Sequence, residues 1–305
     1  MNKFKDYFKN LTGVIKKTAN AWIAADPFRQ SAVISYYAIF SIPALLVIII
    51  TCVGSAFGQE AIQGKISGQI SGAMGADTAK QVEDMIAKAG SQKNSLIATI
   101  ISIVTLILGA TGVFAQLQTS LNLIWEVKVV AKKKFLKTLK DKLFSFGLIL
   151  SIGFLMLISL LLTTGLEAFS GWVKVHLPDF MLVVFKLLNF IISFGGVSVL
   201  FALMFKILPD AKIKWRDVWI GAIATSLLFI LGKFGLGIYF AKASPGSTYG
   251  AAGSIILIML WVSYSSMILF FGAEFTKQYA VSKGRNVEPK AGAELIEHEE
   301  KEKKK

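Results

Sequence analysis

The chain has 305 residues, 54% of them hydrophobic, and a mean hydropathy of +0.61. Its charged fraction of 17% lies well below the value of about 25% that is usual for soluble domains, so an ordinary soluble fold is excluded. The formal charge of +14 would suit nucleic-acid binding, but the basic residues lie between apolar stretches, as in the loops of membrane proteins. Nucleic acid is therefore not expected as a partner.

Long apolar stretches run through the whole chain. Residues 30–59, 94–125, 143–166 and 243–273 carry no charge, and two further apolar stretches contain one lysine each, Lys186 and Lys233. Because about 20 apolar residues cross the hydrocarbon core as a helix, the sequence predicts an all-α, integral membrane helical bundle with six transmembrane helices. In chain order these spans cover about 31–54, 95–115, 143–169, 181–205, 217–240 and 251–273.

The basic residues alternate between rich and poor segments. The rich segments 1–30, 116–142, 206–216 and the part after residue 274 hold 25 of the 33 lysines and arginines. The poor segments 57–94, 168–180 and 241–249 hold 6, and Lys186 and Lys233 complete the total. Cytoplasmic loops carry such an excess, so both termini are expected in the cytoplasm. Trp215 and Trp219 then mark the inner end of the fifth span.

The segments outside the spans also favour helices. Residues 1–30 predict a cytoplasmic amphipathic helix on the membrane, with Leu11 and Ile15 on its apolar face, and a new helix is expected to begin at Pro27, after the capping residue Asp26. Residues 57–94 form the long outer segment, where isoleucines four residues apart from Ile62 to Ile70 predict a surface helix, with a second helix near 79–89.

Two cytoplasmic segments complete the predicted organisation. The basic stretch from Lys128 to Lys142 is interpreted as an interfacial helix. The six-span domain then covers residues 31–280, and residues 281–305, rich in Glu and Lys, are expected to form a disordered tail.

Small and polar residues align along single faces of the predicted spans. Gly109, Gly112 and Gln116 share one face of the second span, and Gly221, Thr225, Gly232 and Gly235 share one face of the fifth. Such stripes let transmembrane helices approach closely and form hydrogen bonds, and this packing role is the favoured interpretation.

Ionisable residues within the spans are the candidate site. Lys233, Lys186 and Glu167 fall at similar outer depth in the predicted topology, with Asn189, Gln116 and Tyr36 as further polar contacts. One interpretation is a positively charged cavity for an anionic headgroup or anion. The alternatives are that both lysines extend to the headgroups, or that a lysine pairs with Glu167 for structure alone.

Residues for catalysis are scarce. The two histidines, His176 and His298, lie far apart, and no nucleotide-binding loop or metal-binding spacing occurs. The sequence therefore predicts neither an enzyme nor a bound metal or cofactor.

Several motifs resemble the YihY or BrkB family of bacterial inner-membrane proteins. The resemblance covers about residues 20–280 and rests on the order and spacing of the following segments: Ser35-Tyr36-Tyr37-Ala38, Ser41-Ile42-Pro43, Leu121-Asn122-Leu123-Ile124-Trp125, Tyr249-Gly250-Ala251-Ala252-Gly253-Ser254 and Gly272-Ala273-Glu274. It implies a six-helix protein of the bacterial inner membrane, in a family linked to envelope integrity and suspected of transporting lipid or another substrate. No catalytic residues are carried over from it.

The sequence as a whole favours a transporter that moves a lipid or an amphipathic anion across or out of the inner membrane, with membrane lipids as its partners. The alternative is a non-transporting scaffold that docks envelope proteins through residues 57–94. Ribonuclease activity, once attached to the family by name, is disfavoured by the residue inventory.

Overall fold

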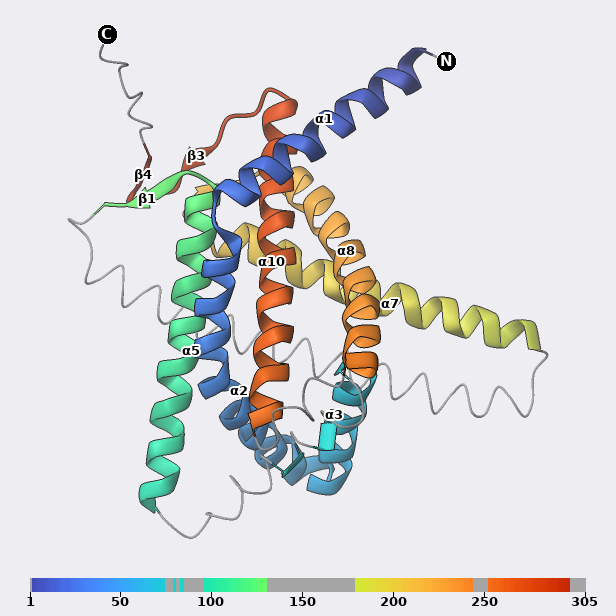
Figure 1. The fold of residues 1–305 in the computed structure, drawn as a ribbon, viewed down its shortest axis with the longest axis vertical. Helices are drawn as coiled ribbons and strands as arrows, with labels where there is room; N and C mark the ends of the chain where they lie inside the picture. Colours follow the sequence, from blue (N-terminus) through green and yellow to red (C-terminus); the bar gives the residue numbers. More distant parts are fainter. Residues whose placement is uncertain are drawn as a thin grey trace. The chain divides into compact units, whose positions relative to one another are not determined.

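In the computed structural model the chain is mostly helical, and the structure describes residues 2–74, 79–80, 83–84, 96–130, 179–243 and 252–296. Two antiparallel pairs of short strands, β1 with β4 and β2 with β3, accompany the helices (Figure 1). The helices within the described residues are α1 (Asn2–Ala24), α2 (Pro27–Phe57), α3 (Gln59–Met74), α5 (Leu96–Ile124), α7 (Asp179–Ile207), α8 (Trp215–Ala243) and α10 (Gly253–Ser282). The strands are β1 (Val127–Val129), β2 (Ala211–Lys212), β3 (Glu288–Pro289) and β4 (Ala293–Leu295).

Three of the described helices are long and apolar enough to cross a bilayer. The segments are Phe190–Ile207 of α7, Trp215–Phe240 of α8 and Ile255–Ser282 of α10, and they overlap the predicted fourth, fifth and sixth spans. The predicted first and second spans fall within α2 and α5, helices of 31 and 29 residues. The predicted third span, 143–169, lies outside the described residues.

The boundary between α1 and α2 falls at Asp26, as the Asp26-Pro27 pair predicted. Asp26 adopts a left-handed backbone with φ of 53°, which breaks the helix, and Pro27 then starts α2 with its fixed φ. The Arg29 guanidinium donates to Asp26 Oδ2 at 2.7 Å, and the Gln30 amide donates to the Ala25 carbonyl. The second contact satisfies the Ala25 carbonyl, which the break leaves without a helical partner.

The chain divides into two compact units, and helices α1, α5, α8 and α10 each contribute to both. Unit 1 comprises Met1–Thr18, Leu121–Leu227 and Gly272–Lys305, and unit 2 comprises Ala19–Ser120 and Leu228–Phe271. Both strand pairs belong to unit 1. The helix predicted from the isoleucines of the outer segment is α3 in unit 2, where Ile70 packs against a buried pair formed by Phe240 of α8 and Leu257 of α10.

Two local expectations differ from the structure. Residues 128–129, placed in a basic helix, belong to β1, and residues 288–289 and 293–295, placed in a disordered tail, form β3 and β4. The reason is strand pairing across the sequence, which satisfies the backbone of both segments and sets Lys128 opposite Glu294. On α1, Val14 and Thr18 are buried and Ile15 is exposed.

Candidate functional site

Helices α8 and α10 meet through a reciprocal glycine–threonine contact in unit 1. A Cβ atom placed on Gly221 of α8 would lie 2.8 Å from Thr276 Cβ, and one placed on Gly272 of α10 would lie 2.8 Å from Thr225 Cβ. Each threonine hydroxyl also donates to the carbonyl of the glycine four residues earlier on its own helix, at 2.6 Å for Thr225 and 2.7 Å for Thr276. The predicted packing role of Gly221 and Thr225 is therefore confirmed.

Helices α2 and α5 approach each other in the same manner in unit 2. A Cβ on Gly109 would lie 3.0 Å from the Ser41 backbone nitrogen, and one on Gly112 would lie 2.6 Å from Cγ of the Tyr37 ring. Gly232 of α8 is likewise covered by Tyr264 of α10, whereas Gly235 has no atom within 4 Å of its Cβ position. The small residues of the second and fifth spans thus mark close helix contacts, Gly235 excepted.

Lys233 lies on the side of α8 that packs against α10. Phe229, four residues earlier, makes an edge-to-face contact with Trp261, with 6.2 Å between the ring centroids. Leu236, three residues later, packs on the Phe240–Leu257 pair. Residues at these spacings share one face of a helix, and the exposed Leu231 and Phe234 lie on another. The Lys233 side chain is half-buried and has no hydrogen bond or ion pair with another described residue.

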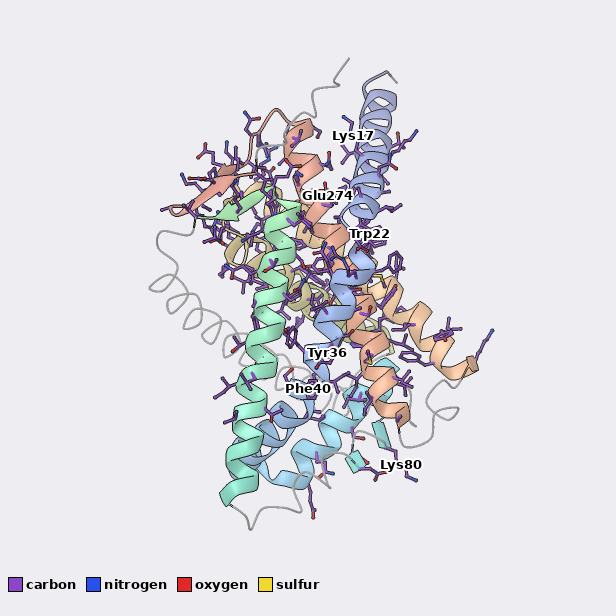
Figure 2. All side chains as sticks on the ribbon, turned by 60° about the vertical axis from the view of Figure 1, so that its left-hand side comes forward. Lys17, Trp22, Tyr36, Phe40, Lys80 and Glu274 are labelled. Carbon is purple, nitrogen blue, oxygen red and sulfur yellow. The ribbon has the colours of Figure 1, made fainter. Side chains whose placement is uncertain are left out.

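Of the other predicted site residues, Tyr36 and Gln116 have side chains that the structure describes. Tyr36 is 55% exposed and stacks edge-on against Phe40 of the same helix (Figure 2), and Tyr37 instead contacts α5. The Gln116 amide donates to Ser120 Oγ at 3.3 Å within α5. Lys186 and Asn189 lie on α7, with side chains that the structure does not describe, and Glu167 lies outside the described residues.

A buried polar cluster in unit 1, which the sequence did not predict, joins three segments. The Asn122 amide donates to Asp210 Oδ2 at 2.9 Å, and the Asp210 backbone N–H donates to Asn122 Oδ1 at 2.7 Å. The Lys290 N–H donates to the Asp210 carbonyl at 2.8 Å, and its ammonium donates to the Pro209 carbonyl at 2.7 Å. These bonds connect the end of α5, the α7–α8 connection and the β3–β4 segment.

Three carboxylates in unit 1 are also bound by side chains of residues in unit 1. Lys277 of α10 donates to Glu126 Oε1 at 2.8 Å, and the Gln278 amide donates to Glu274 Oε1 at 2.7 Å, with Glu274 only 2% exposed. Arg285 pairs with the buried Asp217 at the start of α8. Lys277 and Glu126 are 151 residues apart in the sequence, so their contact carried no local signal.

The surface of α8 identifies the class of protein. Exposed large apolar side chains recur every three or four residues along it, and the opposite side buries small and hydroxyl-bearing residues. The exposed ones are Trp219, Ile223, Leu227, Leu231, Phe234 and Ile238. Apolar residues outside and small polar residues inside are expected where lipid is the solvent, so this is a helical membrane protein. The chain belongs to the virulence factor BrkB family, whose model matches residues 20–295.

Its relatives agree with this class. A protein of Tolumonas auensis named as a UPF0761 membrane protein is 30% identical over 60% of this chain and 58% of its own length. Proteins of the same name from Verminephrobacter eiseniae and Pseudoalteromonas atlantica are 26% and 24% identical, over 72% and 80% of this chain and 49% and 78% of their own lengths. The alignments therefore span less than two thirds of the first two relatives. No solved structure matches this chain.

Proposed function

We propose that this protein is a non-enzymatic transporter of the bacterial inner membrane, with six transmembrane helices and both termini in the cytoplasm, which moves a lipid or an amphipathic anion. The observation that carries this proposal is the position of Lys233. It lies within the apolar segment Trp215–Phe240 of α8, on the side that packs against α10.

A lysine in such a segment costs about 2.5–3.5 kcal/mol on insertion scales, and usually faces protein, water or a partner charge. Lys233 has no counter-charge among the described residues, and its neighbours on that face are the aromatic Phe229 and the aliphatic Leu236. An ammonium group with one aromatic and one apolar neighbour suits the phosphate or carboxylate of an amphipathic substrate, whose apolar part would meet the same walls.

Helix α3 supports the proposal as a cover at the end of this face. Its Ile70 packs against Phe240, seven residues and about two helical turns beyond Lys233. In the proposed topology α3 lies on the outer surface, so its displacement from Phe240 and Leu257 would open the Lys233 side of α8 toward the outer leaflet.

The test is lipid movement in reconstituted vesicles. Fluorescent phosphatidylglycerol or phosphatidylcholine is placed in the vesicles, and the fraction that an external reductant quenches is followed with time. Lys233→Met should reduce the rate to that of protein-free vesicles, and Lys233→Arg should retain part of it. Lys242→Met, which removes an exposed lysine from the last turn of the same helix, should leave the rate unchanged.

Two results would overturn the proposal. If the wild-type protein moves neither lipid faster than it moves in protein-free vesicles, lipid movement is excluded, and the alternative of a scaffold that docks partners through residues 57–94 is favoured. If Lys233→Met moves lipid as fast as wild type, Lys233 is not part of the site.

A further inference from the structure

The start of α8 carries a patch of exposed basic and aromatic side chains. Before the helix, side chains alternate between buried and exposed: Ala211 and Ile213 are buried, and Lys212 and Lys214 are exposed. Trp215 and Arg216 are then exposed in the first turn of the helix. Trp219 is exposed one turn later, on the same side as Trp215. Two tryptophans beside basic residues at the end of a bilayer-length helix are typical of the membrane–water interface.

The acidic groups near this patch are engaged elsewhere. Asp210 bonds Asn122, Asp217 pairs with Arg285, and Glu288 faces Lys212 at 3.4 Å. Lys214 and Arg216 have no ion pair with any described residue. The patch therefore presents two positive charges, at Lys214 and Arg216, that no acidic side chain in the described part of the chain compensates.

Lys206 fixes the aromatic ring between these charges. Its ammonium donates to the Ile213 carbonyl and lies 5.6 Å from the centre of the Trp215 ring. Because this cation is bound to a carbonyl and a ring face, it holds Trp215 in place. The ring is thus preorganised, and a ligand that packs on it loses less conformational entropy in binding.

An apolar ridge continues from the patch along α8. Trp219, Ile223 and Leu227 follow Trp215 at steps of four residues, and all are exposed. The ridge from Trp215 to Leu227 rises about 18 Å along the helix. One leaflet contributes about half of a hydrocarbon core that is about 30 Å thick, so the ridge is as long as one acyl layer.

We propose that this face of α8 binds an anionic phospholipid of the adjoining leaflet, with its phosphate between Lys214 and Arg216 and its acyl chains along the ridge. Charge complementarity favours an anionic over a zwitterionic lipid, because a zwitterionic headgroup would bring a positive charge of its own next to Lys214 and Arg216. The proposed site covers residues 214–227 of α8, whereas Lys233 lies about five helical turns beyond Trp215. This inference therefore does not depend on the transport proposal.

Native mass spectrometry of the purified protein in detergent tests the site. Wild type should retain dioleoyl phosphatidylglycerol more tightly than dioleoyl phosphatidylcholine. The double variant Lys214→Gln/Arg216→Gln should bind phosphatidylglycerol about 25-fold more weakly, since each basic residue near an anionic headgroup contributes about fivefold in affinity. Lys80→Gln/Lys242→Gln, which removes two exposed lysines elsewhere, should bind as wild type does.

A second measurement uses tryptophan fluorescence. Brominated phosphatidylglycerol should quench the wild type more strongly than brominated phosphatidylcholine, and this difference should disappear in Trp215→Phe/Trp219→Phe. Equal binding of both lipids by the wild type would overturn the proposal. So would an equal loss of phosphatidylglycerol binding in Lys214→Gln/Arg216→Gln and in the control Lys80→Gln/Lys242→Gln. Displacement of phosphatidylglycerol by inorganic phosphate alone would show an anion site that does not use the ridge, and would also overturn it.

Discussion

Asn122 and Asp210 hold each other by two hydrogen bonds although 88 residues separate them in the sequence. The amide of Asn122 donates to the Asp210 carboxylate, and the amide oxygen accepts the Asp210 backbone N–H, so both polar ends of the asparagine are used. Both residues are buried. Since the Asp210 carbonyl also accepts the N–H of Lys290, this pair is the centre at which α5, the α7–α8 connection and the β3–β4 segment meet.

Replacing Asn122 with alanine should lower the free energy of unfolding by about 2–3 kcal/mol, because the buried Asp210 loses two hydrogen bonds, one of them to a charged carboxylate. Thermal or denaturant unfolding of the purified protein in detergent measures this loss. Thr119→Ala is the matched control, since Thr119 lies one turn earlier on α5, is exposed and bonds only the Ala115 carbonyl. Its effect should be below about 0.5 kcal/mol. Equal losses in the two variants would contradict the central role of the Asn122–Asp210 pair.

Periodicity and charge predicted most of the helical architecture. The charge-free stretches give α2, α5 and α10, and the Asp26-Pro27 pair gives the boundary between α1 and α2. These features could be predicted because bilayer thickness and proline geometry act locally on the chain. The contact faces of α5 and α8 could also be predicted, because a row of glycines along one face can be seen on a helical wheel without knowing which helix packs against it.

The polar cluster and the strand pairs could not be predicted in this way, because they depend on contacts between distant segments. Val127-Lys128-Val129 and Ala293-Glu294-Leu295 do show the alternation of a strand, with Lys128 opposite Glu294 in the register. Three residues are too few for such a pattern to outweigh a run of lysines that favours a helix. The same distinction applies to the candidate site. The face of α8 on which Lys233 lies can be predicted from helical spacing. The exposure of Tyr36 cannot, because it depends on the contact that Tyr37 makes with Gly112 of another helix.

The contact between Gly221 and Thr276 predicts strong sensitivity to a single methyl group. Gly221→Ala places a carbon 2.8 Å from Thr276 Cβ and 3.1 Å from Thr276 Cγ2, so the helices must separate. Overpacking of this kind costs about 1–3 kcal/mol. Gly235→Ala on the same helix adds its methyl where no atom lies within 4 Å, and should leave the unfolding temperature unchanged or slightly higher. Thr276→Ala should partly restore the stability of Gly221→Ala, and a double variant no more stable than Gly221→Ala would show that the threonine is not the obstacle.

The charges around Lys277 predict an asymmetry between two substitutions on α10. Lys277 donates to the partly exposed Glu126 and its charge also acts on the buried Glu274, so Lys277→Met leaves two carboxylates without this cation and should cost about 1–3 kcal/mol. Glu274→Gln removes a buried negative charge and keeps an oxygen to accept the Gln278 amide, so its cost should be below about 1 kcal/mol. The double variant should recover part of the loss of Lys277→Met, because one of the two uncompensated charges is gone. Unfolding of the four proteins in one detergent gives the coupling energy directly. Additive effects in the double variant would show that Lys277 and Glu274 do not interact, and that Lys277 stabilises the fold through Glu126 alone.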